Sequence, residues 1–154
     1  MTKHHELGRR IVGAVVTVAV TLSLGLALAP SAQATVVLRG EMYRATNRSR
    51  LDRSEHRLKL DARMSAKARR HSLAMANAGN LFHTSNVNTY LKGHHWTRWG
   101  ENVGMTTEDI SVLERAFMHS PEHRTNILNG TFKHVAVGAI RRGGKLWVTV
   151  FFYG

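Results

Sequence analysis

The sequence predicts an α+β domain: helices, a short strand, more helices and a closing β-hairpin. Apolar residues recur at helical spacing in residues 36–49, 62–78 and 108–119. The chain ends in an apolar run over residues 135–140 and a run rich in Val and aromatic residues over residues 146–153, separated by the turn sequence Arg142-Gly143-Gly144-Lys145. Segregated helices and antiparallel strands of this kind pack as an α+β fold.

Length and composition narrow the class of protein. The chain has 154 residues, which fits one domain, and 43% are hydrophobic, which excludes a disordered tail. It has no cysteine, so disulfides, thiolate metal sites and cysteine catalysis are excluded. The formal net charge is +12.

Residues 1–34 have the layout of a secretory signal peptide. Lys3, Arg9 and Arg10 precede an uncharged apolar run over residues 11–29, and Ser31-Ala32-Gln33-Ala34 offers a small-residue cleavage site. The alternative is a membrane anchor, because the apolar run approaches the length needed to span a bilayer. We expect a secreted protein whose folded domain covers residues 35–154, with 19 basic and 9 acidic side chains.

The first half of this domain is predicted to contain two helices. Residues 36–49 form the first, and residues 51–60 are polar and irregular. Asp61 is a suitable N-cap for a second helix over residues 62–78, and Gly79 is suited to end it. Residues 80–100 have no clean period and read as a long ordered loop, a kind of segment that is often functional.

The second half is predicted to continue with a short edge strand over residues 101–105. Thr107 is expected to cap a helix over residues 108–119, and Ser120 to cap a following helix that has Pro121 in its first position and ends near residues 129–130. Residues 135–140 and 146–153 form the two strands of the closing hairpin.

Three residues stand apart from simple packing needs: His83, Glu101 and His123. Two imidazoles and a carboxylate match the minimal ligand set of a catalytic zinc site. They match a general acid and base without metal equally well. Each is also a common residue in an ordinary structural role, and their separation along the chain does not establish that they meet.

A series of short motifs carries a resemblance to a known family. The motifs are His83-Thr84-Ser85, Gly100-Glu101-Asn102-Val103 and the run Phe117 to Leu128. In this order they resemble the bacterial branch of the CAP superfamily, the SCP-like extracellular proteins related to cysteine-rich secretory proteins, antigen 5 and plant pathogenesis-related proteins.

The resemblance implies an α-β-α sandwich around a central antiparallel sheet, and a cleft that holds two His and two Glu in many members. His83, Glu101 and His123 take three of these positions. The second Glu position falls on Ser120, so Glu114 is the nearest upstream substitute and is expected as a fourth cleft group. Ser120 is then expected to cap the helix that places His123, and Asn102 to hold a loop through its amide.

These observations predict a binding module that acts outside the cell, with a cleft expected to bind a divalent metal through His83 and His123. Zinc suits this donor set, and binding should weaken as imidazole protonates near pH ~6.5. The alternative function is a metal-dependent or His/Glu-dependent hydrolase, peptidase-like, although the chain has no Gly-x-Ser-x-Gly or His-Glu-x-x-His motif.

The partner is left open between a lipid, a peptide and an anionic component of the cell envelope. The basic charge favours anionic partners, and export argues against nucleic acid. We expect a monomer. Six arginines crowd the first part of the domain: Arg39, Arg44, Arg48, Arg50, Arg53 and Arg57.

Overall fold

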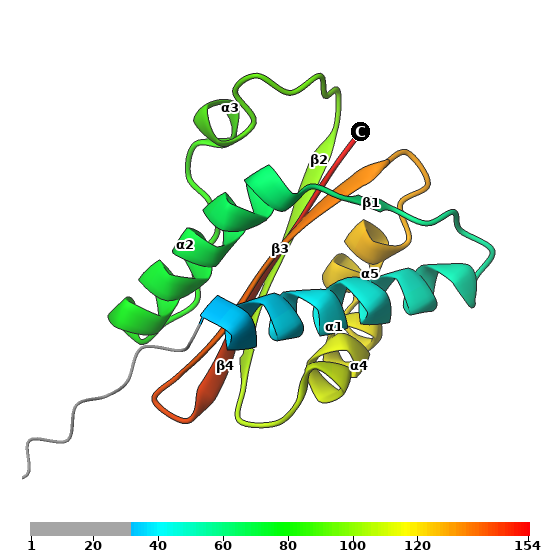
Figure 1. The fold of residues 1–154 in the computed structure, drawn as a ribbon. Helices are drawn as coiled ribbons and strands as arrows, with labels where there is room; N and C mark the ends of the chain where they lie inside the picture. Colours follow the sequence, from blue (N-terminus) through cyan, green and yellow to red (C-terminus); the bar gives the residue numbers. More distant parts are fainter. Residues whose placement is uncertain (1–31) are drawn as a thin grey trace, which may run out of the picture.

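The structure, a computed structural model, describes residues 32–154 (Figure 1). The predicted signal peptide lies outside the described residues except for its last three positions, which begin the first helix. Within residues 32–154, no helix has both the length and the apolar character needed to cross a bilayer. The elements are α1 (Ala32–Leu51), β1 (Lys59–Leu60), α2 (Ala62–Ala78), α3 (Val87–Tyr90), β2 (Trp99–Thr106), α4 (Ile110–His119), α5 (Pro121–Ile127), β3 (His134–Arg142) and β4 (Lys145–Tyr153).

The strands form one sheet in the order β1-β3-β4-β2. The predicted hairpin is confirmed: β3 and β4 pair antiparallel, from His134 opposite Tyr153 to Arg142 opposite Lys145. Strand β2 pairs antiparallel with β4 and lies at one edge, as predicted, but it extends over residues 99–106. Two residues of β1 pair parallel with the start of β3 at the other edge.

The sheet lies between two helical layers. In Figure 1 it is seen nearly edge-on, with α2 on one side and α1, α4 and α5 on the other. Alternate residues of β3 face the two layers, because successive strand side chains point to opposite faces. Val135 and Val137 belong to the core cluster that includes residues of α1, α4 and α5. Ala136 packs with Met64 and Ala68 of α2. The α-β-α sandwich implied by the resemblance is therefore the observed fold.

Helix α2 approaches the sheet closely at Gly138. A Cβ at this position would lie 2.2 Å from the carbonyl carbon of Ala68, so only glycine fits. Within the described part of the chain, β3 has no strand partner on its β1 side beyond Val135, and serines of α2 satisfy its backbone there. Ser65 Oγ accepts from the Val137 N–H at 3.0 Å, and Ser72 Oγ donates to the Gly138 carbonyl at 3.0 Å. This edge of β3 is thereby covered by a helix.

The helices differ from expectation in their ends and in one cap: α1 is longer than residues 36–49, and α5 ends at Ile127 and not near residues 129–130. Helix α4 starts at Ile110 after Asp109, not after Thr107, because β2 continues to Thr106, whose hydroxyl accepts from the Glu108 N–H at 3.0 Å. Ser120 is the N-cap of α5, but its side chain makes no capping hydrogen bond. The cap at Asp61 is confirmed, with its side chain accepting from the Met64 N–H.

Two segments predicted to be irregular contain regular structure. Residues 51–60 include β1, and the loop over residues 80–100 includes the single turn α3.

One of the six arginines clustered in the first part of the domain is not a surface residue. Arg50 is fully buried, and its guanidinium donates to the carbonyls of Ile127 (2.6 Å) and Asn129 (3.0 Å), so α1 holds the end of α5.

Candidate functional site

The structure brings His83, Glu101 and His123 to one cavity of about 370 Å³. His83 lies in the loop after α2, Glu101 on β2 and His123 in the first turn of α5. The cavity therefore forms where the edge strand β2 meets both the loop from one helical layer and a helix of the other. Its remaining lining residues are Trp99, Gly100, Glu122 and Asn126.

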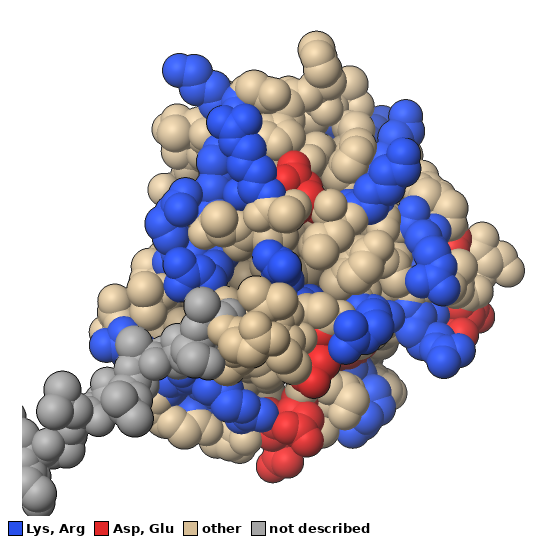
Figure 2. All heavy atoms as spheres, viewed as in Figure 1, with Lys and Arg blue, Asp and Glu red and all other residues tan. Residues whose placement is uncertain are grey.

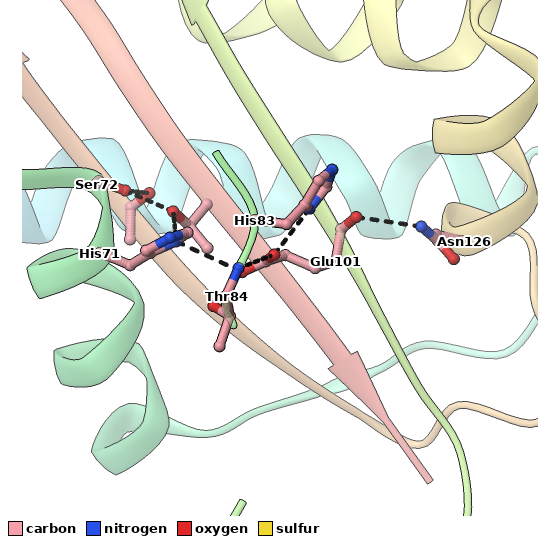
Figure 3. A network of polar contacts seen from close by, with 8 residues as sticks. His71, Ser72, His83, Thr84, Glu101 and Asn126 are labelled. Carbon is pink, nitrogen blue, oxygen red and sulfur yellow. Dashed lines mark hydrogen bonds and ion pairs between the residues drawn. The ribbon is translucent and has the colours of Figure 1, made fainter. Parts of the chain in front are cut away.

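Glu101 is the central group of this arrangement (Figure 3). Its side chain is 1% exposed, and both carboxylate oxygens have donors. Oε2 accepts from His83 Nδ1 at 2.8 Å and from the Thr84 N–H at 2.9 Å. Oε1 accepts from the Thr84 hydroxyl at 2.6 Å. A buried carboxylate with several donors is held in one orientation, and Glu101 in turn fixes the ring of His83, which is 61% exposed.

A second imidazole contacts the same carboxylate from α2. His71 Nδ1 lies 3.4 Å from Glu101 Oε1 and 3.3 Å from the hydroxyl of Thr149. Thr149 and Ser72 are in turn hydrogen-bonded at 3.0 Å. Burial lowers the pKa of His71, an effect opposed by Glu101, and the nearby His83 lowers it further. A polar chain thus runs from the cavity wall into the α2–β4 interface.

Helix α5 is fixed to β2 by two asparagines. Asn102 Nδ2 donates to the carbonyl of His123 at 3.0 Å, and Asn126 Nδ2 donates to Asn102 Oδ1 at 2.9 Å. The predicted amide role of Asn102 is confirmed, although it holds the first turn of a helix and not a loop. Gly100 permits the close contact, because a Cβ there would lie 2.5 Å from Asn126 Oδ1.

The surroundings of His123 disfavour its protonated form. Burial lowers its pKa below the usual 6.5, the proximity of His83 lowers it further, and Glu122 opposes the shift. One side of the ring packs on Phe117, with ring centroids 4.8 Å apart. A half-buried imidazole that stays neutral at physiological pH can accept a proton or a metal ion through a ring nitrogen.

Glu114, expected as a fourth cleft group, does not line this cavity. Its carboxylate lies between α4 and α1, where Oε2 accepts from the Thr46 hydroxyl at 3.2 Å. Burial raises the pKa of Glu114, while hydrogen bonds from Ser49 and Thr46 act in the opposite direction. The cavity therefore has two carboxylates, the buried Glu101 and the exposed Glu122.

The donors available to a metal ion are few. Residues 32–154 contain no cluster of three or more His, Cys, Asp or Glu side chains arranged to hold a metal. The imidazoles that line the cavity are those of His83 and His123.

A larger cavity of about 760 Å³ opens beside the first one and shares His83. Its wall includes Phe82, which is 37% exposed, and Tyr90, together with the cationic side chains of Lys67 and Arg70. This combination of apolar wall and cations is typical of a site for a molecule with an apolar part and an anionic group.

Sequence reasoning missed His71 and Thr149. His71 does carry a signal, because it follows Met64 and Ala68 at the spacing of the buried face of α2. A histidine on that face needs a polar partner from the sheet. Thr149 alternates with apolar residues of β4 and carries no comparable signal in the sequence.

Comparisons with known proteins agree with the fold. Residues 43–152 match the Cysteine-rich secretory protein family, abbreviated CAP. Protein YkwD of Bacillus subtilis (strain 168) is 31% identical over 114 residues, which covers 69% of this chain and 43% of that protein.

Solved structures share the fold at lower identity. An extracellular SCP-domain protein of Bacillus anthracis has a TM-score of 0.69 at 23% identity, with 79% of this chain and 41% of that chain covered. A cysteine-rich secretory protein of Staphylococcus aureus has a TM-score of 0.67 at 19% identity, with 80% and 40% covered. An outer surface protein of Borrelia burgdorferi has a TM-score of 0.66 at 13% identity, with 75% and 92% covered.

This chain spans less than half the length of YkwD and of the Bacillus anthracis and Staphylococcus aureus proteins. The family match nevertheless covers most of the chain and includes His83, Glu101 and His123. From the sequence match and the shared sandwich together, the chain belongs to the CAP (cysteine-rich secretory protein) family.

Proposed function

We propose that this protein is an extracellular binding module whose cavity binds a divalent metal ion, zinc in the first instance, through His83 and His123. The observation that carries the proposal is the hydrogen bond from His83 to Glu101, on the wall of a cavity that also contains His123. Glu101 is a positioning residue in this proposal and not a ligand.

The tautomer of His83 follows from its partner. An ionised carboxylate only accepts hydrogen bonds, so the Nδ1 that lies 2.8 Å from Glu101 carries the proton. The lone pair of His83 is then on Nε2. Histidine ligands of metal ions commonly have this arrangement, in which a carboxylate fixes the ring and increases its basicity.

His123 is suited to ligation by its protonation state. Metal binding requires neutral imidazole, and burial together with the nearby His83 lowers the pKa of His123. A metal ion held by His83 and His123 would keep exchangeable coordination positions, and the ion would supply Lewis acidity toward a bound carbonyl or phosphate oxygen.

The proposed ligand occupies the larger neighbouring cavity. Phe82 and Tyr90 offer apolar and aromatic contacts, and Lys67 and Arg70 offer positive charge. A lipid, a peptide or an anionic envelope component has the complementary chemistry. The placement outside the cell rests on the signal-like residues 1–34 and on similar proteins described as extracellular or outer-surface.

Zinc titration by calorimetry tests the metal site. We expect one zinc per wild-type molecule at pH 7.5, and loss of binding in both His83→Ala and His123→Ala. His95→Ala is a matched control, because His95 is exposed and does not line the cavity. Binding should also fall as the pH is lowered through about 6.5. No heat and no bound zinc in the wild type would reject the proposal.

The hydrolase alternative is tested with the same proteins. The pairing of His83 with Glu101 is the geometry of a general acid–base group, so a peptide pool should be incubated with wild type and His83→Ala, with and without chelator. Cleavage that is lost in His83→Ala would assign a hydrolase and replace the binding-only function.

A further inference from the structure

Strand β2 has one free edge, and the histidine cavity lies across it. The strand order places β2 at the end of the sheet, next to β4 alone. Figure 3 shows Glu101 of β2 with His83 on one side and Asn126 of α5 on the other. The lining of the cavity combines these residues with Trp99 and Gly100 of the strand itself. A molecule that enters the cavity therefore meets the edge of the sheet.

The hydrogen-bond pattern fixes which backbone groups point to this edge. Arg98 and Gly154 exchange two N–H to carbonyl hydrogen bonds, both of 3.1 Å, and they continue the register of β2 with β4. In an antiparallel pair, residues alternate between bonding the partner strand and pointing away from it. The backbone groups of Gly100 therefore point to β4, and those of Trp99 and Glu101 point to the free edge.

Three of these outward groups have no hydrogen-bond partner within residues 32–154. They are the N–H and carbonyl of Trp99 and the N–H of Glu101, whereas the Glu101 carbonyl accepts from Asn126 Nδ2 at 3.3 Å. Trp99 is 42% exposed, and Glu101 as a whole residue is 5% exposed although its side chain is only 1% exposed, so solvent reaches mainly its backbone. Accessible, unpaired backbone groups of this kind are where an extended peptide adds to a sheet.

The side chains of an added strand would alternate between the two faces of the sheet. A residue opposite Gly100 would point toward the α5 layer. That side is closely packed, because a Cβ on Gly100 itself would lie 2.5 Å from Asn126 Oδ1, and this favours a small residue. The residues before and after it would point toward the α2 layer, on the side of the larger cavity that also contains His83.

Charge selects the kind of peptide. Among the described residues that line the larger cavity, Lys67 and Arg70 are charged and none is acidic. Figure 2 shows Lys and Arg spread across the face that includes α1 and α2, with few acidic side chains between them. Such a surface raises the local concentration of anionic partners. Acidic side chains on either side of the small residue are therefore complementary to this part of the protein.

We propose that the free edge of β2 binds an extended acidic peptide as an added parallel strand, with a small residue opposite Gly100 and an acidic residue on either side of it. In a parallel ladder, the small residue donates to the Trp99 carbonyl and accepts from the Glu101 N–H. The inference rests on the proposed binding function, because it names the ligand of the same cavity. The strand pairing itself needs no metal ion.

The probe is the peptide acetyl-Val-Glu-Ala-Glu-Val-amide, added to the full chain and followed by NMR amide hydrogen exchange. We expect the exchange of the Glu101 N–H to slow about tenfold at saturation, while the Asn102 N–H, which points to β4, is unchanged. Methylating the alanine nitrogen removes the N–H that faces Trp99, and should weaken binding about tenfold by calorimetry. Methylating the nitrogen of the next glutamate is the matched control, because that N–H points away from β2, and should change affinity less than about twofold.

The acidic side chains are tested separately. Replacing both glutamates of the peptide by glutamine should weaken binding to the wild type about fivefold, and Arg70→Gln should remove most of this preference. Arg69→Gln is the matched control and should retain it, because Arg69 is the exposed neighbour of Arg70 but lines a different cavity. Both substitutions are at exposed helix positions, where the fold tolerates glutamine.

Each contrary result has a distinct meaning. Equal weakening by the two methylations would overturn the strand pairing, and an equal preference for glutamate in Arg70→Gln and Arg69→Gln would overturn the acidic recognition. Protection of the Glu101 N–H without peptide, increasing with protein concentration, would assign the edge to a second copy of the chain and overturn the peptide as partner. Zinc binding without peptide binding would reject this inference alone. Peptide binding in the presence of a chelator, by a protein that binds no zinc, would reject the metal site alone.

Discussion

Replacing Glu101 by glutamine tests whether one buried carboxylate organises the histidine site. Its two oxygens receive His83 Nδ1, the Thr84 N–H and the Thr84 hydroxyl within 2.9 Å, and His71 lies 3.4 Å away. A glutamine amide has one oxygen and two N–H donors. The oxygen must face His83 and the Thr84 N–H, because an NH₂ group there would oppose two donors.

The expected loss follows from this count. Two charge-assisted hydrogen bonds become neutral, and the NH₂ group must reuse the Thr84 hydroxyl as an acceptor. At about 1 kcal/mol for each bond that loses its charge, Glu101→Gln should lower the free energy of unfolding by about 2 kcal/mol. Zinc affinity should fall about 10–100-fold, the usual effect of removing a partner that orients a ligand.

Urea unfolding followed by tryptophan fluorescence measures the free energy of unfolding, and calorimetry measures the zinc affinity. Glu122→Gln is the matched control, since Glu122 lines the same cavity but is exposed, and it should change stability by less than about 0.5 kcal/mol. If Glu101→Gln were as stable as Glu122→Gln, the hydrogen bonds assigned to Glu101 would not hold the site together.

Three further changes test other parts of the structure by urea unfolding. Burial lowers the pKa of His123, so the unfolded chain binds a proton at this imidazole before the folded chain does as pH falls. The free energy of unfolding should therefore decrease as pH drops from 7.5 through 6.5, and His123→Gln should make this dependence on pH weaker. Burial raises the pKa of Glu114 above 4.5, so the unfolded chain loses this proton first as pH rises, and the stability of the wild type falls. Glu114→Gln has no such proton to lose. We therefore expect this variant to be more stable than wild type at pH 7.5, by about 1 kcal/mol, but not at pH 4. Gly138→Ala places a Cβ 2.2 Å from the Ala68 backbone, and should destabilise by about 3 kcal/mol because backbone cannot rotate aside; an unchanged midpoint would contradict the contact.

Local signals in the sequence predicted much of the fold. The Asp61 cap, the hairpin and the helices follow from hydrogen-bonding preference and apolar spacing, which act over a few residues. The two-residue strand β1 and the start of α4 could not be predicted in this way. Both depend on where the β3 and β2 ladders begin and end, and therefore on pairing with distant strands.

The candidate site divides in the same way. The motif order along the chain identified His83, Glu101 and His123, but their meeting at the β2 edge depends on the sheet register and on the asparagine contacts that hold α5. The same tertiary arrangement placed His71 on Glu101 and Glu114 against α1.

By itself, the sequence determined the fold class through the periodicity of its apolar residues. Its short motifs determined the family and identified the three residues that share the cavity. Only the tertiary structure decided which oxygen of Glu101 receives which donor, and that Arg50 is buried. Those features arise where helices from separate parts of the chain pack on one sheet, and burial exists only after that packing.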